Sequence, residues 1–145
     1  MLRISHSDWT FLRAHGEQTY PHECCGILLG TIDIDKDERQ VKQVIRAGNT
    51  RLDSLHKRYS IDPKELIAAQ KQARLAGLDI VGFYHSHPDH PPRWSQTDFA
   101  EAHWIGCSYV ITSVTKGKAD MTNSFALTGS TEEDKKFVDE QLQIT

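Results

Sequence analysis

The sequence predicts an α/β sandwich built around a mixed β-sheet. Segments with the residue pattern of β-strands alternate along the chain with segments that carry helix start signals, which is typical of this class. The connection at residues 115–118, "TKGK", is short enough to join two antiparallel strands. With 145 residues, of which 38% are hydrophobic and 26% charged, the chain is expected to form one globular domain over residues 1–145.

The N-terminal third predicts one helix followed by two strands. Residues 7–19 can form the helix, with Ser7 or Asp8 as its N-cap, because both side chains accept hydrogen bonds from helix N–H groups. The apolar run at residues 25–32 fits a buried strand. Residues 40–47 alternate polar and apolar side chains, as a strand with one buried face does.

The middle of the chain predicts a loop, a short strand and a second helix. The loop spans residues 48–57, and the strand residues 58–61, "RYSI". Asp62 then offers an N-cap and Pro63 fills the first helical position, which together are a strong start signal. An apolar stripe follows at helical spacing, and the helix is expected to end at Gly77.

The C-terminal half predicts three strands and two helices. The strands are expected at residues 79–86, 107–114 and 119–127. A helix at residues 95–104 separates the first two. Ser130 and Glu133 have the spacing of a capping box, which predicts a last helix containing Phe137 and Leu142.

Composition and charge argue against several classes of partner. A net charge of −3 and a pI near 6.2 give no electrostatic reason to expect nucleic acid. No apolar run approaches the roughly 18 residues that span a membrane. The N-terminus lacks the basic and apolar regions of a signal peptide, so a cytoplasmic location is expected. Three cysteines, Cys24, Cys25 and Cys107, are an odd number in such a chain and predict reduced thiols.

Residues 82–98, "GFYHSHPDHPPRWSQTD", hold a candidate metal site. His85 and His87 are two residues apart at the end of a predicted strand, so their imidazoles point to the same face. Asp98 follows in the first turn of the next predicted helix. Two nitrogens and one carboxylate oxygen suit zinc, and catalytic zinc sites usually combine three protein ligands with a water. One Zn²⁺ per chain is therefore expected.

Two further residues have types that would complete a hydrolytic site. A zinc-bound water has its pKa lowered from ~15.7 to about 7, which makes hydroxide available at neutral pH. Glu23, in "PHECCGILLG", is the candidate general base that takes the proton and delivers it to the leaving group. Ser95 could donate a hydrogen bond to the oxyanion that forms when a carbonyl is attacked.

Each of these features also has an ordinary explanation. A His-x-His pair occurs by chance in many proteins. Ser95 and Asp98 have the spacing of a normal helix N-terminus, where serine caps and an acid suits the helix dipole. Glu23 by itself would be a solvated loop carboxylate. The combination of all five residues is what favours a metal site.

This combination resembles a known family. "HSHPDHPPRWSQTD" fits the pattern His-x-His-Pro-x6-Ser-x-x-Asp, and with the upstream Glu23 it is similar to the JAMM motif of MPN-domain metallopeptidases. "YPHECCGILLG", "RYSIDPKEL" and "GLDIVGFYHSHP" also look like segments of its compact bacterial members, so the resemblance covers roughly residues 9–114. Trp94 departs from the related sequences, which frequently have proline before the serine.

The resemblance implies a fold and a role for each motif residue. The fold would be a three-layer α/β/α sandwich with a mixed central sheet, related to the cytidine deaminases. His85, His87 and Asp98 would be the zinc ligands, Glu23 the general base and acid, and Ser95 a donor to the oxyanion. A zinc deaminase is the rival on this fold, but the chain has neither its His-x-Glu nor its Pro-Cys-x-x-Cys pair.

The resemblance also implies a substrate class. The family hydrolyses amide bonds next to the C-terminal Gly-Gly of ubiquitin-like proteins, and its compact members act on sulphur-carrier proteins. The expected reaction is therefore cleavage after Gly-Gly of a small ubiquitin-like or sulphur-carrier protein, with residues 51–58, "RLDSLHKR", as a candidate contact for the bound tail.

Two alternatives stay open at this point. One is an isopeptidase that removes a ubiquitin-like modifier from lysine. The other is a non-catalytic MPN-type binding module with a structural zinc. Glu23 argues against the second alternative because a structural zinc needs no general base, and no fourth protein ligand is apparent.

Overall fold

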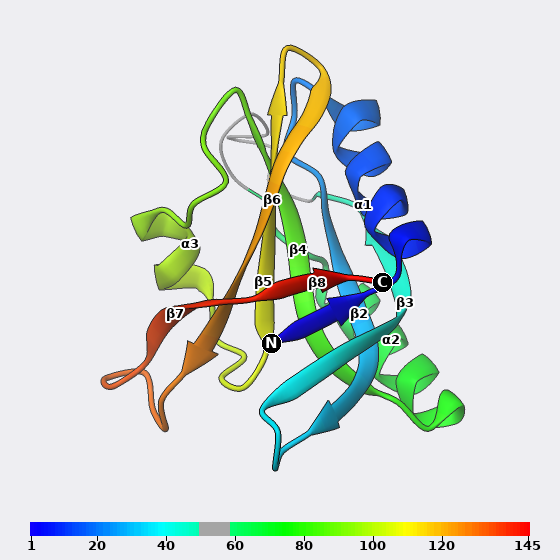
Figure 1. The fold of residues 1–145 in the computed structure, drawn as a ribbon, viewed down its shortest axis with the longest axis vertical. Coiled ribbons are helices and arrows are strands. Elements are labelled where there is room, and N and C mark those ends of the chain that lie inside the picture. The colour runs from blue at the N-terminus through cyan, green and yellow to red at the C-terminus, as the bar shows by residue number, and fades with distance from the viewer. Residues whose placement is uncertain (50–58) are drawn as a thin grey trace.

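The computed structural model describes residues 1–49 and 59–145. Its elements are β1 Leu2–Ile4, α1 His6–Thr19, β2 Cys25–Asp33, β3 Glu38–Ala47, α2 Pro63–Ala76, β4 Asp79–Pro88, α3 Gln96–Glu101, β5 Ser108–Thr115, β6 Lys118–Thr128, β7 Lys136–Glu140 and β8 Leu142–Ile144. Over these described residues the strands form one eight-stranded sheet in the order β7-β6-β5-β4-β2-β3-β1-β8 (Figure 1).

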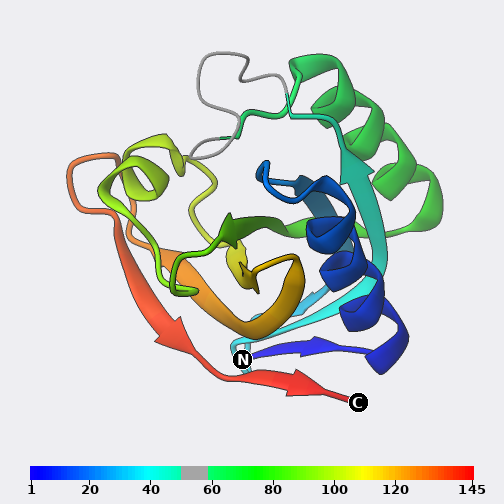
Figure 2. The same ribbon diagram turned by 90° about the horizontal axis from the view of Figure 1, so that it is seen from above.

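The sheet is mixed, as the sequence predicts. Strand β4 pairs parallel with β5, whereas β2 pairs antiparallel with both β3 and β4, and β5 pairs antiparallel with β6. Strands β7 and β8 stand at the two ends of the sheet order but are consecutive in the chain. The sheet is therefore strongly curled, which is visible from above in Figure 2.

Helices cover both faces of the sheet and give the predicted sandwich. Leu12 of α1 packs into one buried cluster with Leu28 and Tyr84, while Ala69 of α2 packs into a second with Phe83. Tyr84 and Phe83 are neighbours on β4, so alternation along the strand sends them to opposite faces. Burial of each such large apolar side chain contributes about 1.5–3 kcal/mol to stability.

The C-terminal helix predicted from the sequence is wrong. Residues that follow the capping-box signal at Ser130 form a turn, and the chain then continues as β7 and β8. Phe137 pairs with Leu127 across β6 and β7 and joins the cluster beneath α2. Pairing with an exposed sheet edge and burial of Phe137 therefore outweigh the local helix signal.

The N-terminal prediction also needs correction. Strand β1, which pairs parallel with β3, was not predicted because it is only three residues long. Helix α1 begins at His6, and its N-cap is Ser5, whose side chain accepts a hydrogen bond from the Asp8 amide. Ser7 and Asp8 therefore lie inside the helix.

Two predicted elements near the candidate site are shorter than expected. The helix predicted at residues 95–104 ends at Glu101. Of the strand predicted at residues 58–61, the described part, residues 59–61, contains one bridge, between Ile61 and Asn49. The candidate tail contact at residues 51–58 lies outside the described residues. The three cysteines are free and buried, in agreement with the prediction of reduced thiols.

None of the helices in the described ranges, 1–49 and 59–145, has the length and apolar character needed to cross a membrane.

Candidate metal centre

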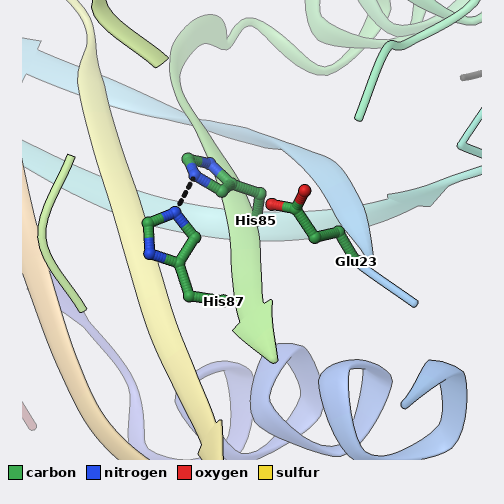
Figure 3. A group of neighbouring side chains, drawn as sticks. All are labelled: Glu23, His85 and His87. Carbon is green, nitrogen blue, oxygen red and sulfur yellow. Dashed lines mark hydrogen bonds between the residues drawn. The ribbon is translucent and has the colours of Figure 1, made fainter. Parts of the chain in front are cut away.

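The two histidines of the motif converge at the end of β4. His85 and His87 point to the same face of the sheet, and their Nε2 atoms are 3.2 Å apart (Figure 3). Ser86, between them, points to the other face and accepts a hydrogen bond from the Cys24 amide. The i, i+2 spacing on a strand therefore produces the convergence that the sequence predicts.

Asp98 comes to the same point from α3. One carboxylate oxygen is 3.3 Å from Nε2 of His85 and the other is 3.1 Å from Nε2 of His87. The capping box at the start of α3 orients this carboxylate. Ser95 Oγ accepts from the Asp98 amide at 3.0 Å, and Asp98 Oδ2 accepts from the Ser95 amide at 2.8 Å. The ordinary helix start and the metal-site geometry therefore coexist in the same residues.

Glu23 approaches from the residues just before β2. Cys25 pairs with His85 in the antiparallel β2–β4 register, so the residue two before Cys25 comes level with the residue two after His85. Glu23 is only 3% exposed, and one oxygen atom of its carboxylate lies within 4.8 Å of a ring nitrogen of each histidine (Figure 3). Strand register thus brings a residue far upstream in the sequence to the site.

A backbone carbonyl orients His87. Nδ1 of His87 is 2.9 Å from the carbonyl oxygen of Pro91, so Nδ1–H donates there and Nε2 faces Asp98. The loop that carries Pro91 is held on both sides of it. Ser113 donates to the carbonyl of His90 at 2.7 Å, and Asn123 donates to the carbonyl of Pro92 at 3.0 Å. No local sequence motif marks Ser113 of β5 or Asn123 of β6 as supporting residues.

An apolar pocket adjoins the cluster on the side of α2. The ring of Tyr59 stacks on His85 with centroids 4.4 Å apart. Tyr59 also lines a pocket of about 360 Å³ whose walls include Phe83, Trp104 and Tyr109, with Glu101 also among its lining residues. The local sequence predicts a short strand around Tyr59 and indicates no role for it in the site.

The chain also matches a known protein family over most of its length. Residues 7–128 match the family described as prokaryotic homologs of the JAB domain. The chain belongs to this family. This match confirms the resemblance to compact bacterial MPN-domain proteins that the motif residues predict.

Several relatives of this JAB-domain chain have descriptive names. A desampylase of Haloferax volcanii is 39% identical over 93 residues, which are 64% of this chain and 63% of that protein. A probable TtuB-protein conjugate cleaving protease of Thermus thermophilus is 35% identical over 92 residues, covering 63% of this chain and 57% of that protein. The match spans less than two thirds of the length of either relative.

Solved structures share the JAB-domain fold. A protein of Desulfitobacterium hafniense is 31% identical with a TM-score of 0.83 and covers 100% of this chain and 93% of that one. A protein of Salinibacter ruber is 36% identical with a TM-score of 0.71 and covers 99% and 91%. A JAB1/MPN domain protein of Archaeoglobus fulgidus, at 15% identity and a TM-score of 0.58, covers 100% and 97% and supports the fold alone.

Burial and polar contacts together set the pKa values of the cluster in this JAB domain. Burial, with a smaller contribution from the Asp98 charge, raises the pKa of Glu23 to about 9. Burial also lowers the pKa of His85, against the opposing effect of Asp98. For Asp98 itself, burial would raise the pKa, but the close contacts with the His85 and His87 imidazoles and a hydrogen bond from the Ser95 amide outweigh it and hold the pKa well below its usual value. These shifts favour a neutral His85 imidazole beside an Asp98 carboxylate anion, the forms in which the two groups bind metal ions.

The donor atoms fit a tetrahedral metal ion. Ligand atoms ~2.0–2.1 Å from a tetrahedral zinc ion lie roughly 3.3–3.4 Å from one another. The two Nε2 atoms are 3.2 Å apart, and Asp98 offers a different oxygen to each of them, Oδ1 at 3.3 Å from His85 and Oδ2 at 3.1 Å from His87. Among the described residues, Oε2 of Glu23 is buried without a hydrogen-bond partner. These atoms form a candidate metal site.

Proposed function

We propose that this protein is a zinc-dependent metallopeptidase. Its substrate would be an amide bond that follows the C-terminal Gly-Gly tail of a small ubiquitin-like or sulphur-carrier protein. The observation that carries the proposal is the convergence of two imidazoles and a carboxylate next to a second, buried carboxylate. Membership of the JAB-domain family and the names of the relatives support it.

His85, His87 and Asp98 are the proposed zinc ligands. Among the described residues, single ligand atoms of Glu23, His85 and His87 also lie close enough together to share one ion, so Glu23 stands directly beside the proposed ligands. A catalytic zinc site usually has three protein ligands and keeps one position for water. When bound, zinc would act as a Lewis acid that polarises a substrate carbonyl and lowers the pKa of a water molecule. The Pro91 carbonyl keeps His87 in the tautomer whose Nε2 is free to bind a metal.

Glu23 is the proposed general base and acid. It would take a proton from the attacking water and deliver it to the leaving amine. A carboxylate with a pKa of about 9 holds its own proton at neutral pH, which is unsuitable for a base. A nearby cation favours the charged form and lowers such a pKa by about 1–3 units. The role of Glu23 therefore depends on a filled metal site.

Ser95 is the proposed donor to the oxyanion. Its Oγ already accepts a hydrogen bond from the Asp98 amide, so the hydroxyl proton remains available to donate outward. Ser95 is exposed at the start of α3, next to the carboxylate of Asp98. A donor at this position could stabilise negative charge that develops on the substrate carbonyl oxygen.

The substrate tail has a candidate binding surface. The pocket lined by Tyr59, Phe83 and Trp104 lies against His85 and is lined largely by apolar and aromatic side chains. An extended tail could place an apolar side chain there before it crosses the cluster. The name of the Thermus thermophilus relative refers to conjugate cleavage, which favours the isopeptidase as the second candidate reaction.

Mass spectrometry on two substrates tests the proposal. A sulphur-carrier protein extended beyond Gly-Gly and the same carrier linked to a lysine side chain would each be incubated with zinc-loaded enzyme. We expect cleavage after Gly-Gly in at least one substrate, and the identity of the cleaved one separates the two candidate reactions. Stoichiometric zinc binding with neither substrate cleaved would instead support the non-catalytic binding module.

Glu23→Gln is the matched variant. We expect it to bind zinc as the wild type does and to lose about 10²–10⁴-fold in turnover, because general acid–base catalysis typically contributes that much. Zinc content measured by atomic spectroscopy serves as the control. Turnover equal to that of the wild type would remove Glu23 from the mechanism.

A further inference from the structure

Helix α3 is too short to be stable without contacts to the rest of the protein. It spans Gln96–Glu101, six residues, and none of them is buried. Isolated helices shorter than about 12–15 residues are marginal in water, so contacts from outside must stabilise this one. The capping box at Ser95 secures its first turn. The position of Asp98 therefore also depends on what holds the other end.

Lys135 binds the C-terminal end of α3. Its Nζ donates to the carbonyl of Phe99 at 3.0 Å and to the carbonyl of Ala102 at 2.7 Å, and it pairs with Glu132 at 2.9 Å. An ammonium group has three N–H donors, and here each has an acceptor. The side chain is only 4% exposed. The Phe99 carbonyl also accepts from the Ala102 amide, and a carbonyl oxygen has two lone pairs, so it can accept from Lys135 as well. A cation at a helix C-terminus also complements the helix dipole.

Phe137 extends the same support to the loop before α3. Its ring contacts Phe99 of the helix and Trp94 of the loop, with centroids 5.7 and 5.4 Å away. It also packs against Tyr109 of β5 in the core beneath the helix. Lys135 and Phe137 both lie beyond residue 128, where the match to the family ends. The support for α3 is thus supplied by the C-terminal segment that the sequence analysis wrongly predicted as a helix.

We propose that Lys135 is a positioning residue for the metal centre. By binding the carbonyls at the end of α3, it fixes the helix one residue away from Asp98 and so sets the carboxylate against His85 and His87. The inference rests on the proposed function, in which Asp98 is a zinc ligand. Glu132, the third partner of Lys135, also accepts from His103, which lines the pocket beside the cluster.

Zinc affinity of a lysine variant tests the inference. Lys135→Met keeps the length and apolar stem of the side chain but removes the three donors. We expect a zinc dissociation constant about 10–100-fold higher, which is the usual effect of losing a group that orients a metal ligand. The measurement is a competition titration with a chelating dye, at a temperature where circular dichroism shows full folding. Lys136→Met, an exposed neighbouring lysine, is the matched control and should bind zinc as the wild type does.

Hydrogen exchange supplies a second readout that needs no metal. In zinc-free Lys135→Met, the Phe99 and Ala102 amides, whose acceptors lie within α3 and its cap, should exchange faster than in Lys136→Met, while amides of β4 keep their protection. If Lys135→Met fails to fold, Lys135→Gln, which retains an N–H donor, replaces it in both measurements. Partial recovery of zinc affinity in Lys135→Arg would further separate positioning from packing.

The outcomes distinguish this inference from the proposed function. A purely structural role would lower stability while leaving the zinc affinity and the α3 exchange of the folded variant equal to those of Lys136→Met, and that result overturns the inference. If the wild type itself binds no zinc, the proposed function fails. The exchange of α3 in the zinc-free variants then still decides whether Lys135 positions Asp98.

Discussion

The candidate metal centre has two arms that are held in different ways. The strand arm, His85 and His87 on β4, lies in the interior of the sheet, with β2 paired on one side and β5 on the other. The helix arm, Ser95 and Asp98 at the start of α3, lies on a helix with no buried residue. Sheet pairing fixes the first arm, whereas a few contacts from the C-terminal segment fix the second.

This difference predicts how each arm responds to substitution. A change that disturbs the strand arm also disturbs strand pairing and the core, so it should lower the free energy of unfolding of the whole protein. A change around the helix arm should alter metal binding or turnover with little effect on global stability. The two arms can therefore be separated by measuring both quantities on the same variants.

Gly82→Ala is the strongest test of the strand arm. Gly82 pairs with Ser108 between β4 and β5, and a Cβ at this position would lie 2.3 Å from the Ser108 carbonyl oxygen. Because that oxygen belongs to the neighbouring backbone, the strands would have to separate. We expect the free energy of unfolding to fall by about 3 kcal/mol or more, measured by urea denaturation.

Gly48→Ala is the control for this substitution. A Cβ on Gly48 would meet no atom within 4 Å. The change should therefore alter the free energy of unfolding by less than about 0.5 kcal/mol. Equal stability of Gly82→Ala and Gly48→Ala would contradict the close pairing of β4 with β5 that is argued to fix the strand arm.

The same difference explains what could be predicted from the sequence. His85 and His87 are two residues apart in a clear strand, so their convergence follows from local geometry. The approach of Glu23 requires the register of β2 against β4, which no local pattern specifies. The position of α3 requires Lys135 and Phe137, in a segment whose local signal predicts helix but whose tertiary pairing makes it strand.

Other predictions from the sequence stay predictions. The α/β sandwich, the mixed sheet and the family are confirmed. Three further expectations stay predictions: the single domain over residues 1–145, the cytoplasmic location and zinc as the metal. Neither the fold nor the spacing of the donor atoms specifies them. The roles of Glu23 and Ser95 stay proposals, which the Glu23→Gln, Ser95→Gly and Ser95→Ala variants test.

A pH titration probes the back of the strand arm. Tyr84 of β4 points away from the metal centre, and its hydroxyl is 2.7 Å from Nδ1 of the buried His15 of α1. Burial, with a smaller contribution from Arg46, lowers the pKa of His15 to about 4. In the unfolded chain its pKa is about 6.5, so between these values the unfolded chain binds the proton that the folded chain does not.

The contribution of His15 to stability is therefore fully present above about pH 6.5 and declines as the pH falls towards 4. Allowing for solvent screening, we expect the metal-free wild type to lose about 1–2 kcal/mol more than His15→Gln between pH 7 and pH 4.5. Urea denaturation of both proteins at both pH values measures this difference, since changes at other groups cancel. Parallel losses in the two proteins would contradict a neutral, buried His15.

Ser95 gives the smallest expected change in stability and the sharpest test of the helix arm. Its hydroxyl caps α3, but the hydrogen bond to Asp98 Oδ2 comes from the Ser95 backbone amide and survives substitution. Glycine is a nearly adequate N-cap and costs a few tenths of a kcal/mol, whereas alanine costs about 1 kcal/mol. Ser95→Gly and Ser95→Ala thus remove the same hydroxyl with different effects on the helix.

Turnover of the two variants separates capping from catalysis. If Ser95 donates to the oxyanion, both variants should lose about 10²-fold in kcat, because each lacks the donor while the Asp98 carboxylate keeps its backbone partner. If Ser95 is only a cap, Ser95→Gly should retain wild-type kcat and zinc affinity, and Ser95→Ala should show a partial loss that follows the stability of α3. The ratio of the two kcat values therefore measures how far the helix arm takes part in the chemistry rather than holding Asp98 in place.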